Sequence, residues 1–133
     1  MPKLELVTAE VCPFAQRSHM TLLEKNLEFE LREVDLENKP SWFETISPYS
    51  KVPVLCHSNI QVYESTIINE YLEESFPEHR LLPDDPSKRA NARIWIDFDN
   101  TKFVPVFYKL LLAQESSLQK ILVAQMTEQL VFL

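Results

Sequence analysis

The absence of glycine is the feature that most restricts what this chain can fold into. None of the 133 residues is glycine, whereas nine are proline. Glycine ordinarily supplies the positive φ angles of tight turns and helix ends, and asparagine is the next most tolerant residue. We therefore expect Asn26, after TLLEK, to end a helix and Asn59, in HSNI, to form a hairpin turn. Proline must therefore mark many of the remaining turns and helix boundaries.

Composition excludes several classes of protein. Hydrophobic residues make up 45% and charged residues 25% of the chain, which is typical of a folded globular protein. The formal net charge of −7 argues against a nucleic-acid partner. No stretch approaches 18 consecutive apolar residues, so we expect no membrane span. The first residues lack the apolar segment of a signal peptide, and two cysteines form no disulfide framework, so we expect a cytoplasmic protein without a metal site.

The first part of the chain reads as an α/β unit in the order β-α-β, α, β-β-α. Proline is tolerated at the first position of a helix, and Pro13 stands where the first helix should begin. The expected elements are strand Lys3 to Thr8, helix Phe14 to Lys25, strand Glu28 to Asp35, short helix Pro40 to Thr45, strands Val54 to His57 and Ile60 to Tyr63, and helix Glu64 to Phe76. In the last helix, Ile67, Ile68, Tyr71, Leu72 and Phe76 should form one apolar face.

A change of composition predicts a domain boundary. PEHRLLPDDPSK is rich in proline and charge, which is typical of a linker. We expect a first domain over 1–78, a linker over 79–85 and a helical region over 86–133. Its first helix, Ser87 to Leu112, should kink or restart at Pro105, and Ser116 with Gln119 should cap a last helix. The chain ends in the apolar residues LVFL, so we expect the helical domain to be incomplete.

The stretch VCPFAQR places Cys12 directly before the first helix. Unpaired N–H groups and the positive end of the helix dipole favour a thiolate there. Cys12 is therefore either a reactive thiol or a small buried apolar residue. Ala15 occupies the position of a second cysteine in a CxxC motif, so a reactive Cys12 needs an external thiol to resolve its disulfides. Cys56 lies inside the strand VPVLCH, which favours a structural role.

Several motifs together resemble one family. They are CPFAQR after the first strand, KVPVL before the third, YES at the start of the third long helix, and EYLEESFP with LLPDDP after it. This set resembles the cytosolic glutathione transferase superfamily, and in particular its cysteine-type omega and lambda classes and glutathione-dependent dehydroascorbate reductases. The resemblance implies a thioredoxin-like N-terminal domain that binds glutathione, followed by an all-α C-terminal region, which looks truncated here.

The resemblance also implies roles for individual residues. Cys12 matches the catalytic cysteine that forms a mixed disulfide with glutathione. The positions that match glutathione-binding residues are Phe14 at the thiol pocket, Lys39 at the glycyl carboxylate, Val52 through its backbone, and Glu64 with Ser65 at the γ-glutamyl end. Pro53 matches a cis-proline of the family. Tyr49 and Ser50 stand where the family commonly carries a glycine, which could change the shape of that loop.

Two functions remain open at this point. The first is an enzyme, a glutathione transferase and thiol oxidoreductase that uses glutathione as co-substrate and no other cofactor. Its second substrate would be a small electrophile, a disulfide or dehydroascorbate, and the family is usually a homodimer. The second is a non-enzymatic binding module on the same fold. Retention of YES at Tyr63 to Ser65 favours glutathione binding.

Overall fold

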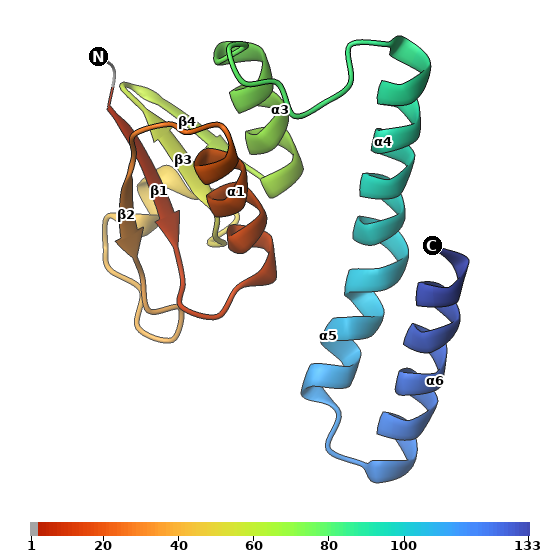
Figure 1. Cartoon of the computed structure of the whole chain (residues 1–133). Helices are drawn as coiled ribbons and strands as arrows, with labels where there is room; N and C mark the ends of the chain where they lie inside the picture. The colour runs from red at the N-terminus through yellow and green to blue at the C-terminus, as the bar shows by residue number, and fades with distance from the viewer. Residues whose placement is uncertain (1–2) are drawn as a thin grey trace. The chain divides into compact units, whose positions relative to one another are not determined.

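The computed structural model describes residues 3–133, which separate into two compact units (Figure 1). The first unit ends at Leu82 and the second runs from Pro83 to Leu133. The first unit contains the mixed sheet of a thioredoxin-like fold, and the second is entirely helical. The predicted fold class is therefore confirmed.

A four-stranded sheet forms the centre of the first unit. Its strands are β1 (Leu4–Thr8), β2 (Glu30–Glu33), β3 (Val54–His57) and β4 (Ile60–Tyr63), in the order β2-β1-β3-β4. β1 pairs parallel with β2 and antiparallel with β3, and β3 pairs antiparallel with β4. The second strand is shorter than the predicted Glu28 to Asp35. All four of its residues are exposed because β2 is an edge strand.

Helices pack on the sheet through two hydrophobic clusters. Helices α1 (Pro13–Glu24) and α3 (Ser65–Ser75) share a cluster with β1 and β3: Leu4, Leu6, Leu22, Leu55, Ile68 and Leu72. Helix α2 (Phe43–Ile46) contributes Phe43 to a second cluster with Val7 and Val54. Because alternate residues of a strand point to opposite faces, the two clusters lie on opposite sides of the sheet. Ile67 was predicted in the apolar face of α3 but is 56% exposed, since it lies at the margin of that face.

Among residues 3–133, four non-glycine residues have positive φ. Helix α1 ends at Glu24 with Lys25 as its C-cap, and Asn26, which was predicted to end it, follows with a φ of 54°. Asn26 N–H donates to Leu23 O and Leu27 N–H to Leu22 O, which is the Schellman pattern of helix termination. Asn59 lies in the two-residue β3–β4 turn, as predicted, and within that turn it is Ser58, with φ of 58°, that takes the left-handed conformation. The other two positions are Ser50 and Glu64.

The second unit contains α4 (Pro86–Phe98), a π-helical segment η1 (Asp99–Phe103), α5 (Val104–Leu112) and α6 (Ser116–Phe132). The predicted restart at Pro105 is found, because α5 begins one residue before it. The predicted capping box is not: α6 begins after Glu115 without a side-chain cap, and the Gln119 side chain donates to Ala113 O instead.

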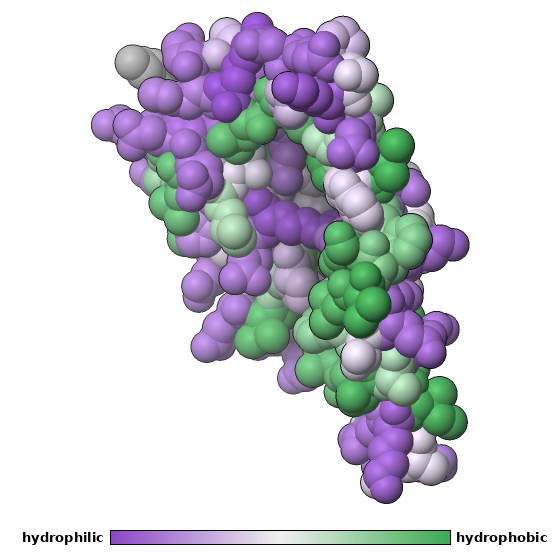
Figure 2. All heavy atoms as spheres, turned by 45° about the vertical axis from the view of Figure 1, so that its right-hand side comes forward, coloured by the Kyte–Doolittle hydropathy of each residue, from purple (hydrophilic) through white to green (hydrophobic). Residues whose placement is uncertain are grey.

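Many large hydrophobic side chains of the second unit are exposed. Leu112, Val131 and Phe132 are each more than two thirds exposed, and hydrophobic side chains are prominent on the surface in Figure 2. Within residues 3–133, none of the helices has the length and apolar character that crossing a membrane requires.

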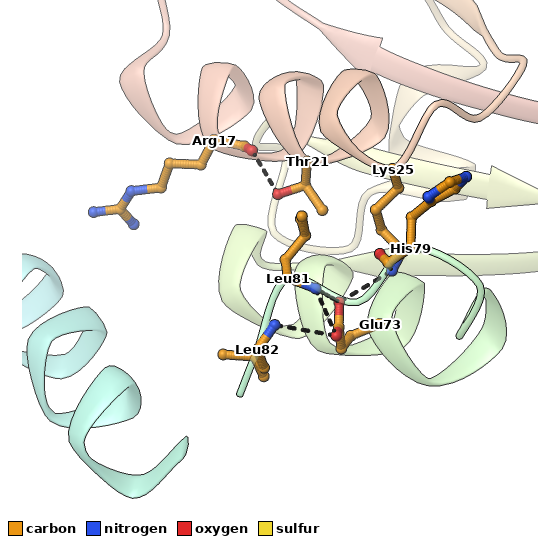
Figure 3. A network of polar contacts seen from close by, with 7 residues as sticks. All are labelled: Arg17, Thr21, Lys25, Glu73, His79, Leu81 and Leu82. Carbon is orange, nitrogen blue, oxygen red and sulfur yellow. Dashed lines mark hydrogen bonds and ion pairs between the residues drawn. The ribbon is translucent and has the colours of Figure 1, made fainter. Parts of the chain in front are cut away.

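A buried ion pair fastens the end of the first unit (Figure 3). The Lys25 side chain is fully buried, and its Nζ donates to Glu73 Oε2 at 3.0 Å and to His79 O at 2.8 Å. The Glu73 carboxylate also accepts from the N–H groups of Leu81 and Leu82. Burial by itself would raise the pKa of Glu73, but the hydrogen bonds from Lys25 and these N–H groups lower it below its ordinary value. Glu73 thus ties the segment after α3 to helices α1 and α3.

We expect Glu73→Ala to lower the free energy of unfolding of the first unit by about 3–5 kcal/mol, because it leaves a buried ammonium without its counter-charge. Urea denaturation followed by circular dichroism measures this change. The exposed neighbour Glu74 provides the matched control, since Glu74→Ala removes a carboxylate from the same helix.

The same pair predicts a dependence of stability on pH. The folded-state pKa of Glu73 lies below its unfolded value of about 4.3. Its contribution is therefore complete above that value and is lost as the pH falls through the folded-state pKa. In Glu73→Gln this acid loss should be smaller than in the parent protein. Identical slopes of unfolding free energy against pH in the two proteins would contradict the assignment.

Candidate functional site

The end of β1, the start of β3 and the end of β4 lie together at the same end of the sheet. β1 and β3 run antiparallel with Val7 opposite Val54, so the end of β1 lies beside the start of β3. β3 and β4 are antiparallel with Val54 opposite Tyr63, which brings the end of β4 to the same edge. Cys12 follows β1, Val52 precedes β3 and Glu64 follows β4. The three residues therefore lie in one region of the first unit.

Cys12 is the N-cap residue of α1. Its φ of −143° is extended, and its Sγ accepts from the Ala15 N–H at 3.4 Å. Its thiol also donates to Val52 O at 3.9 Å. The side chain is half-buried, and Cys12 is not part of a disulfide. The Cys12 sulfur thus faces an N–H group at the start of α1 and remains partly accessible.

A small pocket of about 120 Å³ opens beside Val52. Its walls come from the loop before β3, the end of β4, and the starts of α1 and α3. The lining residues are Phe14, Ser47, Tyr49, Lys51, Val52, Pro53, Tyr63, Glu64 and Ser65. The Val52–Pro53 peptide bond is cis. Cys12 is not in the pocket wall, but its thiol contacts the carbonyl of Val52, which is.

The starts of α1 and α3 are joined by polar contacts at Ser65. The fully buried Ser18 hydroxyl donates to Ser65 O at 3.4 Å, and Arg17 Nη1 donates to Ser65 Oγ at 3.5 Å. The Arg17 guanidinium lies 5.0 Å from the centroid of the Phe14 ring. Ser65 is the first residue of α3 and is buried, whereas Glu64 before it is exposed with φ of 71°. The two residues therefore offer a carboxylate and helical N–H groups to the same pocket.

The loop before Val52 is held by two side chains. The buried Ser47 hydroxyl donates to Lys51 O at 2.7 Å and accepts from Lys51 N–H at 2.9 Å. The exposed Lys39 donates from Nζ to Ser50 O at 3.2 Å and to Ser50 Oγ at 2.9 Å. Lys39 is not among the residues that line the pocket, but its partner Ser50 directly precedes the lining residue Lys51.

The structure thus brings together Phe14, Val52, Pro53, Glu64 and Ser65, with Cys12 beside them. Sequence reasoning did not select Ser47, Tyr49, Lys51 or Tyr63 as site residues. The rings of Tyr49 and Tyr63 meet edge to face at 5.2 Å across 14 positions of sequence. Lys51 and Tyr63 lie within the motifs KVP and YES, and Ser47 and Tyr49 lie shortly before KVP. These positions were the only signal in the sequence, because the contacts of the four residues depend on the folded loop.

Comparison with known proteins decides the family. The model of the family "Glutathione S-transferase, N-terminal domain" matches residues 6–80, more than half of the chain. The chain belongs to the glutathione S-transferase family. It is 41% identical over 96 residues to the omega-1 glutathione S-transferase of Mus musculus, which covers 71% of this chain and 40% of the mouse protein.

Solved structures of this family share the fold. The glutathione transferase Omega 3C from Trametes versicolor matches with a TM-score of 0.88 and 36% identity, covering 98% of this chain and 57% of the fungal one. Rice GST1, solved in complex with glutathione, also gives a TM-score of 0.88, at 35% identity, covering 98% of this chain and 60% of the rice one. The chain spans less than two thirds of the length of each of these three relatives.

The role of the Ser47 hydroxyl in holding the loop before Val52 can be tested by substitution. Ser47→Ala removes both hydrogen bonds that close the loop onto Lys51, at a cost of about 1–3 kcal/mol for buried groups left unpaired. We expect faster hydrogen exchange at the Lys51 amide, measured by NMR. The exposed Ser41 supplies a control, because Ser41→Ala should leave that exchange unchanged. Unaltered protection of Lys51 in Ser47→Ala would show that the hydroxyl does not hold the loop.

Proposed function

We propose that this chain is a glutathione-dependent thiol transferase in which Cys12 forms a mixed disulfide with glutathione. The observation that carries the proposal is the position of the Cys12 thiol, between the Ala15 N–H at the start of α1 and the Val52 carbonyl at the pocket. The cysteine-type resemblance and the omega-class relative support the same assignment.

Glutathione fits the charges and backbone groups of the pocket. Its γ-glutamyl end carries an ammonium and a carboxylate. Glu64 provides an acceptor for the ammonium, and Ser65 with the first N–H groups of α3 provides donors for the carboxylate. The Val52 backbone lies between this end and Cys12, where the cysteinyl part of the tripeptide would bind. The rice relative, solved in complex with glutathione, supports this ligand.

The proposed chemistry is thiol–disulfide exchange. The Cys12 thiolate attacks the glutathione sulfur of a mixed disulfide, forms the Cys12–glutathione disulfide and releases the other sulfur as a thiolate, which takes a proton. A glutathione thiolate then attacks the glutathione sulfur of this disulfide. Oxidised glutathione leaves, and Cys12 returns as a thiolate. Ala15 stands where a resolving cysteine would be, so the second step depends on external glutathione.

Aromatic conjugation is expected to be weak in comparison. That reaction needs a group that activates the thiol of bound glutathione without bonding to it, whereas a cysteine thiolate is itself the nucleophile. Small disulfides and dehydroascorbate are therefore the substrates to examine first. We further propose that the protein works in the cytoplasm as a homodimer, in keeping with the family resemblance.

The direct test is intact mass after incubation with oxidised glutathione. We expect one glutathione adduct that a reductant removes, and none in Cys12→Ser. Cys56→Ser is the matched control and should keep the adduct, because burial raises the pKa of the Cys56 thiol and lowers its thiolate fraction.

The outcome without an adduct is equally informative. A folded chain that binds glutathione but forms no Cys12 adduct would contradict the exchange mechanism and favour the non-enzymatic binding module. An adduct on Cys56 instead of Cys12 would contradict the assignment of the reactive thiol.

Binding at the γ-glutamyl end has its own prediction. Ser65→Ala should weaken glutathione binding by about tenfold or more, the effect of one hydrogen bond to a charged group. Isothermal titration measures the dissociation constant. Ser75→Ala, at the other end of α3, is the control and should bind as the parent does. Equal affinity in Ser65→Ala and the parent would remove Ser65 from the site.

A further inference from the structure

A second cavity of the first unit opens at the end of the sheet opposite Cys12. Its volume is about 750 Å³, and its walls come from the start of β1, the loop between α1 and β2, and the segment that follows α3 (Figure 1). The lining residues are Lys3, Leu4, Asn26, Leu27, Glu28, Phe29, Glu30, Phe76 and Glu78. None of them lines the pocket beside Val52, so the two cavities are separate.

The inner wall of this cavity is apolar. Leu4 belongs to the hydrophobic cluster that α1 and α3 form with the sheet. Leu27, Phe29 and Phe76 pack against the same cluster but are only half-buried, so part of each side chain faces outward. Cavities of this volume are typical of sites that bind small organic molecules. The wall therefore favours a ligand with an aromatic or other apolar body, which would remove these side chains from water.

The rim of the cavity is acidic. Glu28, Glu30 and Glu78 contribute three carboxylates, whereas Lys3 contributes the only ammonium among the lining residues. Lys3 Nζ already pairs with Glu30 Oε2 at 2.8 Å. The exposed side chains of Glu28 and Glu78 have no ion-pair partner within residues 3–133. Two carboxylates thus remain uncompensated beside an apolar wall, and a positively charged group on the ligand would complement them.

Hydrogen bonds within the protein hold both sides of the cavity. On one side, Leu27 N–H donates to Leu22 O at 3.1 Å and fixes the loop after α1. On the other side, the buried Lys25 ammonium donates to His79 O at 2.8 Å, directly after Glu78. Because these contacts exist without a ligand, binding requires little ordering of the walls, which favours affinity.

We propose that this cavity is a second ligand site, which binds a small organic cation with an aromatic or apolar body. The body packs on Leu27, Phe29 and Phe76, and the cationic group lies at the rim beside Glu28 and Glu78. The inference does not rest on the proposed glutathione chemistry, since it uses none of the residues of that site.

The experiment titrates three probes that share a naphthalene ring and differ in charge: 1-naphthylmethylamine, 1-naphthalenemethanol and 1-naphthoate. Shifts of the amide NMR signals report where each probe binds and how tightly. The parent protein is compared with Glu28→Gln, Glu78→Gln and the double variant. Glu37→Gln is the matched control, because it removes an exposed carboxylate of the first unit that does not line the cavity. The amine titration is repeated with saturating glutathione.

We expect the amine to shift the amide signals of Leu27, Phe29 and Glu78 and to bind more tightly than the alcohol, with naphthoate the weakest. Each substitution at the rim should weaken binding of the amine by about twofold to fivefold, as for exposed ion pairs. Binding of the uncharged alcohol should be unchanged. The parent and Glu37→Gln should bind the amine equally, and glutathione should not displace it.

Three results would overturn the proposal. Absence of a saturable shift at the cavity amides would show that the cavity is not a ligand site for this class. Equal affinity for the three probes, or an equal loss in Glu37→Gln, would show that the carboxylates at the rim do not select a cation. Displacement of the amine by glutathione would place it in the pocket beside Val52 instead.

Discussion

The antiparallel pairing of β1 with β3 is the constraint on which the rest of the site depends. It sets Leu6 opposite Leu55 and Val7 opposite Val54, so each strand buries side chains in both hydrophobic clusters. A shift of one residue would send the side chains of one strand to the opposite faces of the sheet and disrupt the packing of both clusters. The same register leaves Cys12 and Val52, forty residues apart, in contact at one edge of the sheet. Packing of apolar side chains thereby positions the thiol.

Hydrogen bonds from polar side chains then hold the loops and helix starts that the sheet has brought together. Ser18 and Arg17 join the starts of α1 and α3 at Ser65, and Ser47 closes the loop before Val52. At the far end of α1, Lys25 and Glu73 hold the segment that leads to the second unit. Such groups add little net stability when exposed and much more when buried, because an unpaired buried group loses its hydration without replacement. The buried members of this set are therefore the ones whose removal should be most costly.

The residues with positive φ show which parts of the backbone conformation could be predicted from the sequence and which could not. Asn26 was predicted as a helix end and has positive φ, because its place after an amphipathic run is a local signal. Ser50, Ser58 and Glu64 also have positive φ, and none was predicted. Serine and glutamate have no strong preference for this conformation, so only the surrounding structure makes them adopt it. At Ser50 that structure includes the ammonium of Lys39.

The sequence by itself determined the order of helices and strands, the position of Cys12 at a helix start, and the family. These follow from local periodicity, proline placement and short motifs, all of which are properties of neighbouring residues. Only the tertiary structure decided that β2 is an exposed edge strand, that Lys51, Tyr49 and Tyr63 line the pocket, and that Lys39 reaches Ser50. Those facts depend on contacts between residues distant in sequence, which exist only once the sheet has fixed its register and brought the loops together.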